Sequence, residues 1–221
     1  EGYSVMGGLE RTPRTLRTRQ NLLLAGALVE RGGATRSDLF AAVFDSASLS
    51  ASLLCDEVVA RIDDLMSEGI GALAPQGHEV SLTEVREVLA SWDRAYRLDS
   101  VGAVLWREFM SSFEERAWLD AGPLWARAFD PEDPMSTPDG LASAPERFTE
   151  PGSDPIMHAL TEAVRVLDTA GIPIDAPLGA VQWADRGDAR VPVHGGGEGE
   201  GMMNVLAPSG ALPSASMEAV P

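Results

Sequence analysis

The stretch Val101-Gly102-Ala103-Val104-Leu105-Trp106-Arg107-Glu108-Phe109-Met110-Ser111-Ser112-Phe113 decides the fold class, because its apolar residues recur at helical spacing. That spacing places Val104, Leu105, Phe109 and Met110 on the inward side of one helix. A helix with such a side has to pack against other elements. The stretch therefore predicts a core helix in a larger helical assembly.

Five further segments show helical periodicity or helix-start signals, and we expect their apolar stripes to be mostly core. They are the run with Leu16, Leu22, Leu23, Ala27 and Val29, which starts near Pro13 and stops at Gly32-Gly33; a short helix capped by Thr35 and Asp38 that runs through Val43; Cys55–Met66; a helix from about Thr83; and Pro155–Ala170, closed by Gly171.

Short extended segments follow near the C-terminus. Ala180–Ala184 and Ala189–Val193 are joined by the turn-like Asp185-Arg186-Gly187-Asp188, which predicts a hairpin. Gly195–Gly201 is expected to be flexible and acidic. The fold class is therefore α+β, mostly helical with a few C-terminal strands. The predicted regions are a helical part at 1–127, a Pro-rich linker at 128–154, a helix with short strands at 155–206, and an irregular tail at 207–221.

Composition and charge argue against two classes of partner. The net charge is −17 and no Lys occurs, whereas nucleic-acid binding needs clustered basic residues. No apolar run approaches the roughly 20 residues that a membrane span requires, and Glu1–Glu10 lacks the pattern of a secretory signal. The single Cys55 cannot form an internal disulfide, and its neighbours Leu53 and Leu54 predict that it is a small buried apolar residue.

Three sets of motifs, in this order, resemble the penicillin-acylase-type amidases, and most closely the acyl-homoserine-lactone acylase branch. The first is Arg14–Arg19 leading into Leu22–Leu24; the second is Trp92-Asp93 with 98–100, 102–109 and 129–141; the third is Pro177–Gly179 with 190–196 and Asn204-Val205. Each set alone is weak. Their order and spacing, over nearly the whole chain, carry the resemblance.

The resemblance implies an N-terminal-nucleophile hydrolase with an αββα sandwich. In such enzymes a zymogen cuts itself, a serine becomes the first residue of the large (β) subunit, and its own amine serves as the base. Backbone N–H groups and an asparagine side chain hold the oxyanion. These groups lie upstream of the matched motifs, so the chain is expected to be an internal fragment of the large subunit. It would then be inactive by itself.

The same resemblance implies the partners and the setting. The substrate would be an N-acyl amide of the acyl-homoserine-lactone, penicillin or lipopeptide type, linked to quorum quenching or antibiotic biosynthesis. The protein partner would be the small (α) subunit of the same precursor, and the compartment periplasmic or extracellular. In the family further sheet strands follow the position of Asn204, where this chain instead continues into Ala207–Pro213 and ends. Strands of the sandwich are therefore expected to be missing or altered at both ends.

Arg17 is the candidate site residue that the resemblance provides, in a supporting role. Its permanent positive charge would lie near the catalytic asparagine and help to keep the nucleophile's amine unprotonated. Arg14 and Arg19 are alternative alignments for this role. An ordinary arginine-rich helix surface that pairs with some of the 34 acidic residues remains open.

The other residues whose side chains could bind a metal or a substrate are expected to have structural roles. His194 is expected to be a hydrogen-bonded structural histidine beside a glycine turn, and His78 and His158 show no ligand spacing. No cofactor is expected; calcium in the parent protein remains an alternative, with Asp130, Glu132, Asp133 and Asp139 as the residues that suggest it. The tryptophans favour core packing, with an acyl pocket as the alternative: Trp92, Trp106, Trp118, Trp125 and Trp183.

Two rival interpretations belong to other classes. The first is a non-catalytic helical interaction module derived from such an amidase. The second is an unrelated helical domain, which would be favoured if Leu16–Val29 and Val101–Phe113 did not pack on a common sheet.

Overall fold

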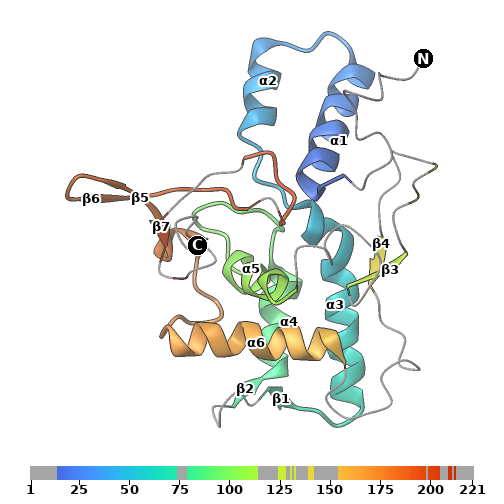
Figure 1. Cartoon of the computed structure of the whole chain (residues 1–221), viewed down its shortest axis with the longest axis vertical. Coiled ribbons are helices and arrows are strands. Elements are labelled where there is room, and N and C mark those ends of the chain that lie inside the picture. Colours follow the sequence, from blue (N-terminus) through green and yellow to red (C-terminus); the bar gives the residue numbers. More distant parts are fainter. Residues whose placement is uncertain are drawn as a thin grey trace.

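The computed structural model describes residues 14–73, 79–113, 124–127, 130, 132, 139–141, 154–197, 199–204, 209–210 and 212. This part of the chain has an α+β arrangement (Figure 1). Its helices are α1 (Leu16–Arg31), α2 (Arg36–Val43), α3 (Leu49–Ser67), α4 (Leu82–Ser91), α5 (Ala103–Ser111) and α6 (Pro155–Thr169).

The strands are short and pair only in antiparallel fashion. β1 (Ala72–Leu73) pairs with β2 (Val80–Ser81), β3 (Trp125–Arg127) pairs with β4 (Asp139–Leu141), and β5 (Gln182–Arg186) lies between β6 (Ala189–Pro192) and β7 (Ser209–Gly210). The β5–β6 hairpin predicted from the sequence is thus confirmed. Its turn is tighter than expected, since the residues at 185 and 186 still belong to β5.

Helix α5 lies at the centre of the body, as its sequence predicts. All residues from Ala103 to Met110 are buried, and α5 packs on α6 while α3 packs on α4. Figure 1 shows α6 crossing the lower part of the body beside α5. A row of aromatic rings runs through this core, with neighbouring centroids 5.0–6.0 Å apart: Trp92, Tyr96, Trp106, Phe109 and Phe113.

Helix starts follow local capping chemistry. The Thr35 hydroxyl and the Asp38 carboxylate form a reciprocal capping box at α2, as predicted. Asp154 caps α6, and Gly171, at φ 67°, follows its end. Helix α1 begins at Leu16, capped by Thr15, so its start is later than the expected one near Pro13, which lies outside the described residues.

The start of α3 corrects a sequence prediction. The helix begins at Leu49, not at Cys55, and Ser48 is its N-cap. The extra turns carry buried serines, whose hydroxyls would be costly to bury without partners. Ser48 Oγ donates to the Glu200 carbonyl oxygen at 2.8 Å, and Ser50 Oγ accepts from Trp106 Nε1 at 2.9 Å. These partners are distant in sequence, so helical periodicity could not predict this start.

Three C-terminal expectations are also corrected. β4 forms inside the predicted linker 128–154, and β7 forms inside the predicted irregular tail 207–221. Most of the segment Gly195–Gly201, predicted to be flexible, is buried, and Gly195 N donates to the Tyr96 carbonyl oxygen at 2.9 Å. Strand partners and close backbone contacts, not local composition, order these segments. The region boundaries at 127, 154 and 206 stay predictions.

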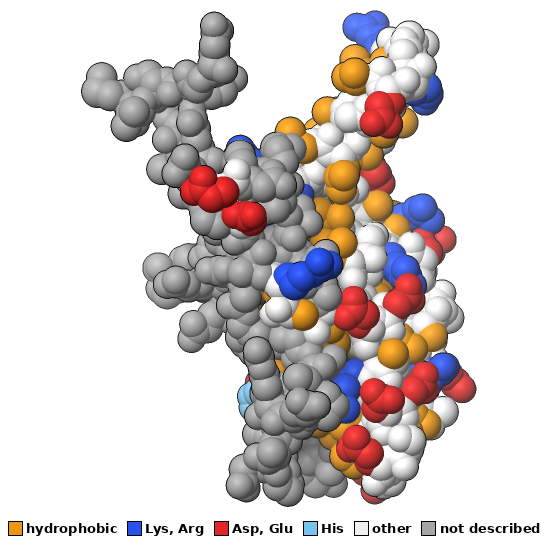
Figure 2. Space-filling model, turned by 90° about the vertical axis from the view of Figure 1, so that its right-hand side faces the viewer, with side chains coloured by type: hydrophobic (Ala, Val, Ile, Leu, Met, Phe, Trp, Pro, Cys, Tyr) orange, Lys and Arg blue, Asp and Glu red, His pale blue; other side chains and the backbone are white. Residues whose placement is uncertain are grey.

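Helices α1 and α2 project from the body as a hairpin (Figure 1). Only Leu16, Arg19 and Gln20 of α1 are buried. Leu22, Leu23 and Val29, expected to be core, are 40%, 58% and 80% exposed, so that prediction is wrong within the described chain. Figure 2 shows apolar side chains along the upper part of this face, where α1 lies.

None of the helices in the described ranges combines the length and apolar character needed to cross a membrane.

Candidate functional site

The parts of the three sets of motifs that lie among the described residues, which exclude most of 129–138 and Val205, converge around the N-terminus of α3. The second and third meet through backbone hydrogen bonds, since Leu178 N donates to the Ser100 carbonyl oxygen at 3.1 Å and Gly195 N donates to Tyr96. The backbone at Glu200 and Gly201, between the parts of the third set, accepts from Ser50 N and Leu49 N, both at 3.2 Å. Motifs far apart in sequence therefore build one site.

The first turn of α1, which begins at Leu16, brings the first set to the same place. A Cβ added at Gly201 would lie 2.7 Å from Leu16 Cβ and 3.0 Å from Leu49 Cβ, so only glycine lets the chain pass between these side chains. Gly201 also has φ 72°, in the left-handed region. The start of α1 is thereby held against α3 and the segment 199–204.

Arg17 and Arg19 both lie in the first turn of α1, which carries no acidic residue. Arg17 is half-buried, and its Nε has no hydrogen-bond partner in the described chain. Arg19 is only 3% exposed, and none of its three guanidinium nitrogens has a partner there. Burial lowers the pKa of Arg19 to about 10. These cations add to the positive end of the helix dipole. The supporting role of Arg17 stays a prediction.

A second polar group is buried between α5 and the third set. Arg107 Nη1 donates to Gln182 Oε1 at 2.6 Å, and Gln182 Nε2 donates to the carbonyl oxygens of Val193 and Gly195 at 3.0 and 2.8 Å. Glu108 lies beside Arg107, with its Oε1 3.8 Å from Arg107 Nε. Gln182 thus links a charged helix side chain to the backbone of the third set.

Glu200 and Tyr96 complete this buried group. Burial raises the pKa of the Glu200 carboxyl, against the opposing effect of the Arg107 charge. Burial and the nearby Glu200 raise the pKa of the Tyr96 hydroxyl, and that hydroxyl has no hydrogen-bond partner among the described residues. No motif in the sequence predicted this group. The available signal was the charged pair Arg107-Glu108 within an otherwise apolar core helix.

His194 has the structural role predicted for it. Its Nδ1 lies 3.0 Å from Ser46 Oγ and 2.6 Å from Asn204 Nδ2, and Gly195 beside it has φ 96°. The Phe44 ring packs against it with centroids 6.3 Å apart. His194 therefore ties the end of α2 to the third set.

The remaining candidates also have structural surroundings. Cys55 is fully buried, burial raises the pKa of its thiol to about 11, and its Sγ lies 3.6 Å from the Leu89 carbonyl oxygen, which confirms the buried role. Trp92, Trp106 and Trp125 are buried as predicted. Trp183 is only half-buried, and Arg190 Cζ lies over its ring, 4.5 Å from the ring centroid. Trp118 lies outside the described residues.

The calcium hypothesis finds no support in the residues that can be placed. Asp130 Oδ1 accepts from the Glu132 backbone N–H at 2.8 Å, which is a local turn contact. Asp133 and His78 lie outside the described residues. Among those described, no group of three His, Cys, Asp or Glu side chains could hold a metal.

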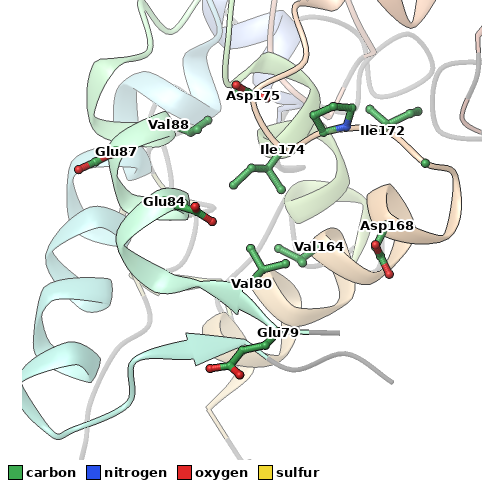
Figure 3. Close-up of a pocket in the computed structure, with 12 residues that line it drawn as sticks. Glu79, Val80, Glu84, Glu87, Val88, Val164, Asp168, Ile172, Ile174 and Asp175 are labelled. Carbon is green, nitrogen blue, oxygen red and sulfur yellow. The ribbon is translucent and has the colours of Figure 1, made fainter. Parts of the chain in front are cut away.

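A cavity of about 550 Å³ lies elsewhere, between α4, β2 and the end of α6. Figure 3 shows Val80, Val164 and Ile174 pointing toward one another, with the side chain of Glu84, from α4, next to them. Its lining consists of aliphatic side chains with carboxylates around them. It does not coincide with the site where the motifs converge.

Comparison with known proteins gives the family. The sequence model of the penicillin amidase family matches residues 2–213. Aculeacin-A acylase of Actinoplanes utahensis is 33% identical over 213 residues, which are 93% of this chain and 24% of that protein. Acyl-homoserine lactone acylase PvdQ of Pseudomonas syringae pv. syringae (strain B728a) is 26% identical over 208 residues, with the same two coverages of 93% and 24%. The chain thus spans 24% of the length of these relatives.

The match also decides against the unrelated helical domain. In the described part α1 packs on α3 and α5 on α6, and the strands form sheets of two or three strands only, an arrangement that was expected to favour that rival. Packing of both helices on a common sheet was the wrong criterion, because the described strands form only small sheets. With the family model matched from residue 2 to residue 213, the chain belongs to the penicillin amidase family.

Proposed function

We propose that these residues are an internal part of the large subunit of an enzyme that hydrolyses the amide bond of N-acyl compounds. The observation that carries the proposal is the family match over residues 2–213, together with the convergence of the matched motifs around α3. Two relatives are named as acylases, of aculeacin A and of acyl-homoserine lactones. A substrate with an acyl chain on an amide nitrogen is the chemistry that these names share.

In this proposal the nucleophile is a serine at the start of the large subunit, outside these residues. Its amine takes the proton as the hydroxyl attacks the amide carbon, and it gives that proton to the departing amine as the C–N bond breaks. Water then attacks the acyl-serine, which releases the carboxylic acid and restores the serine. The part of the chain described here holds the first turn of α1 in place. Arg17 would supply a fixed positive charge that disfavours protonation of that amine and supports the developing negative charge.

The wider setting belongs to the same proposal. The parent fold would be an αββα sandwich. Autoproteolysis of a zymogen would divide it into a small and a large subunit and free the amine of the leading serine. The enzyme would act in the periplasm or outside the cell, in quorum quenching or in antibiotic biosynthesis. A shared N-acyl amide chemistry is compatible with both settings.

A non-catalytic interaction module is the second candidate, and the exposed hairpin α1–α2 favours it. Both candidates contain the same fold. Turnover separates them, because a module would bind through the hairpin without cleaving an amide.

The test compares the full-length protein with residues 1–221 on chromogenic N-acyl amides of increasing chain length. We expect turnover by the full-length protein only, and loss of turnover when its leading serine is replaced by alanine. In the full-length protein, Arg17→Gln should lower kcat by on the order of 10²-fold, the scale of losing one charge-stabilising group. Arg17→Lys should restore part of the rate.

The matched control is Arg36→Gln, on the exposed surface of α2, which should leave kcat unchanged. Turnover by residues 1–221 alone would disprove the placement of the nucleophile. An unchanged kcat in Arg17→Gln would remove Arg17 from the mechanism.

A further inference from the structure

The hairpin α1–α2 exposes its large apolar side chains on its outer sides. Of the ten large apolar residues that are exposed in the described part, seven belong to it: Leu22, Leu23, Val29, Leu39, Phe40, Val43 and Phe44. Single exposed apolar residues are ordinary, but a contiguous patch indicates an interaction surface. The concentration of exposed residues on one projecting unit therefore needs an explanation.

Helical spacing places these residues on two opposite surfaces. The faces that α1 and α2 turn toward each other border a cleft of about 440 Å³ and carry mostly small or mixed side chains, including Ala27, Ala41 and Ala42. Leu22 and Val29 lie on the side of α1 away from this cleft, and Leu23 lies at its edge, one turn before Ala27. Phe40 and Phe44, with ring centroids 6.5 Å apart, lie on the side of α2 away from the cleft. Both outer sides are apolar, so a cover has to reach around the hairpin.

Arg19 adds a polar requirement to the same surface. Arg19, Leu22 and Leu23 follow one another at i, i+3 and i+4, so they share one side of α1. A buried guanidinium without a partner is strongly disfavoured, and a carboxylate is the group that satisfies it best. The partner surface therefore combines apolar side chains with a carboxylate.

A second copy of this chain does not meet these requirements. Two copies would each carry a net charge of −17 and would repel each other. A two-fold contact buries the same patch on both copies and would leave the opposite side of the hairpin exposed. Each copy would also bring to the contact another Arg19 for which the described residues supply no partner.

The relatives of this chain contain far more polypeptide, since it spans 24% of their length. We infer that the hairpin α1–α2 is a docking element embedded in the remainder of the full-length amidase. That remainder covers both outer apolar sides and places a carboxylate against Arg19. The inference rests on the proposed function in one respect, namely that these residues are part of a longer enzyme.

Thiol labelling tests the two apolar sides separately. Leu23→Cys and Phe40→Cys are compared with Ala60→Cys, at an exposed position of α3, in residues 1–221 and in the native full-length protein. The native Cys55 is buried and stays unlabelled. In residues 1–221 all three introduced thiols should react rapidly with maleimide, as read by mass spectrometry on the peptide.

In the full-length protein the thiols at 23 and 40 should react at least about 100-fold more slowly, as for sites that are reached only by local opening, while the thiol at 60 stays fast. Equal labelling rates in the two proteins at 23 and 40 would overturn the inference. A discrete dimer of residues 1–221, seen by sedimentation, in which the thiols at 23 and 40 are protected would also overturn it, in favour of a second copy.

Arg19→Met tests the carboxylate by the sign of its effect. In residues 1–221 the change removes a buried charge that has no partner among the described residues, so the melting temperature should rise by about 2–4 °C. In the full-length protein it leaves the partner carboxylate unpaired, so the melting temperature should fall. A shift in the same direction in both proteins would rule out the carboxylate.

These outcomes are distinct from failure of the proposed function. Protection at 23 and 40 in a full-length protein without turnover would keep the docking element and reject the acylase. Turnover without protection would do the reverse.

Discussion

At the scale of single residues, the site depends on Gly201 and Glu200, which pass between α1 and α3. Gly201 leaves no room for a side chain between Leu16 and Leu49. Glu200 is buried among charges from α5, while its carbonyl oxygen accepts from Ser48 and Ser50. The two neighbours thus serve packing and electrostatics at the same point.

Gly201→Ala should destabilise the chain more than Gly187→Ala. Both glycines have positive φ, 72° and 61°, so an alanine at either costs about 1–2 kcal/mol in backbone strain. Nothing lies within 4 Å of a Cβ at Gly187, whereas the clash at Gly201 should add about 1–3 kcal/mol. Urea unfolding measures both variants. Equal losses would mean that Leu16 and Leu49 can move aside.

Glu200→Gln should change how stability depends on pH. Burial raises the pKa of Glu200 in the folded chain above its ordinary value of 4.5, so the folded state keeps a proton that the unfolded state releases. The stabilising contribution is therefore present below that ordinary value and is lost as pH rises through the folded pKa. Glutamine carries no such proton.

The measurement is the urea midpoint from pH 4 to pH 7. The fall of this midpoint with rising pH should be smaller in Glu200→Gln than in the wild type. Glu87→Gln, at an exposed position of α4, is the control and should keep the wild-type profile. A decline that is the same in all three proteins would show that Glu200 does not cause it.

At the scale of elements, Gln182 of β5 joins α5 to the segment that follows β6. It accepts from Arg107 and donates to the backbone at Val193 and Gly195. This small polar contact positions a helix and a loop that periodicity alone does not place together. The β5–β6 hairpin projects from the body with Gln182 at its buried end (Figure 1).

Gln182→Leu should cost about 3–5 kcal/mol, because it keeps the volume but leaves the buried Arg107 without its acceptor. Gln182→Leu combined with Arg107→Met also removes the charge that would be left without its acceptor, and should lose less than Gln182→Leu alone. Guanidinium unfolding of the two proteins measures the difference. If Gln182→Leu were equally destabilising with and without Arg107→Met, the hydrogen bond from Arg107 would not be the stabilising contact.

At the scale of the whole molecule, the chain combines a packed body with a hairpin, α1–α2, whose outer sides expose large apolar side chains. The body buries α5 from Ala103 to Met110, whereas the hairpin α1–α2 exposes seven large apolar side chains. In the three-stranded sheet, β6 and β7 are edge strands, whose free backbone groups favour pairing with other chains. Residues 1–221 by themselves should therefore associate nonspecifically.

The double variant Leu23→Glu with Phe40→Glu should reduce that association in residues 1–221. Both positions are more than half exposed, so the free energy of unfolding should change by no more than about 0.5 kcal/mol. Binding of a hydrophobic dye and light scattering should both fall. Ala60→Glu with Ala90→Glu adds the same charge at exposed alanines and should have a smaller effect. If both double variants reduced association equally, the added negative charge alone would explain the reduction.

Elements with local signals could be predicted from the sequence. The capping box at Thr35 and Asp38, the glycine after α6 and the apolar spacing of α5 all act within a few residues. The early start of α3, β4, β7 and the buried segment at Gly195 could not be predicted, because their hydrogen-bond partners are distant in the chain. Of the site, the sequence indicated Arg17 by resemblance but not the group of Arg107, Gln182 and Glu200.

The sequence by itself determined the helical body, the α+β class and the family, since periodicity, capping and motif order are carried by neighbouring residues. Only the tertiary structure decided which apolar stripes are covered: that of α5 is buried, and that of Leu22, Leu23 and Val29 is not. The physical reason is that periodicity shows that a helix has an apolar side but not whether a neighbour is present to bury it. The same holds for charge, since a sequence shows an arginine, and only packing shows that Arg19 is buried with no hydrogen-bond partner among the described residues.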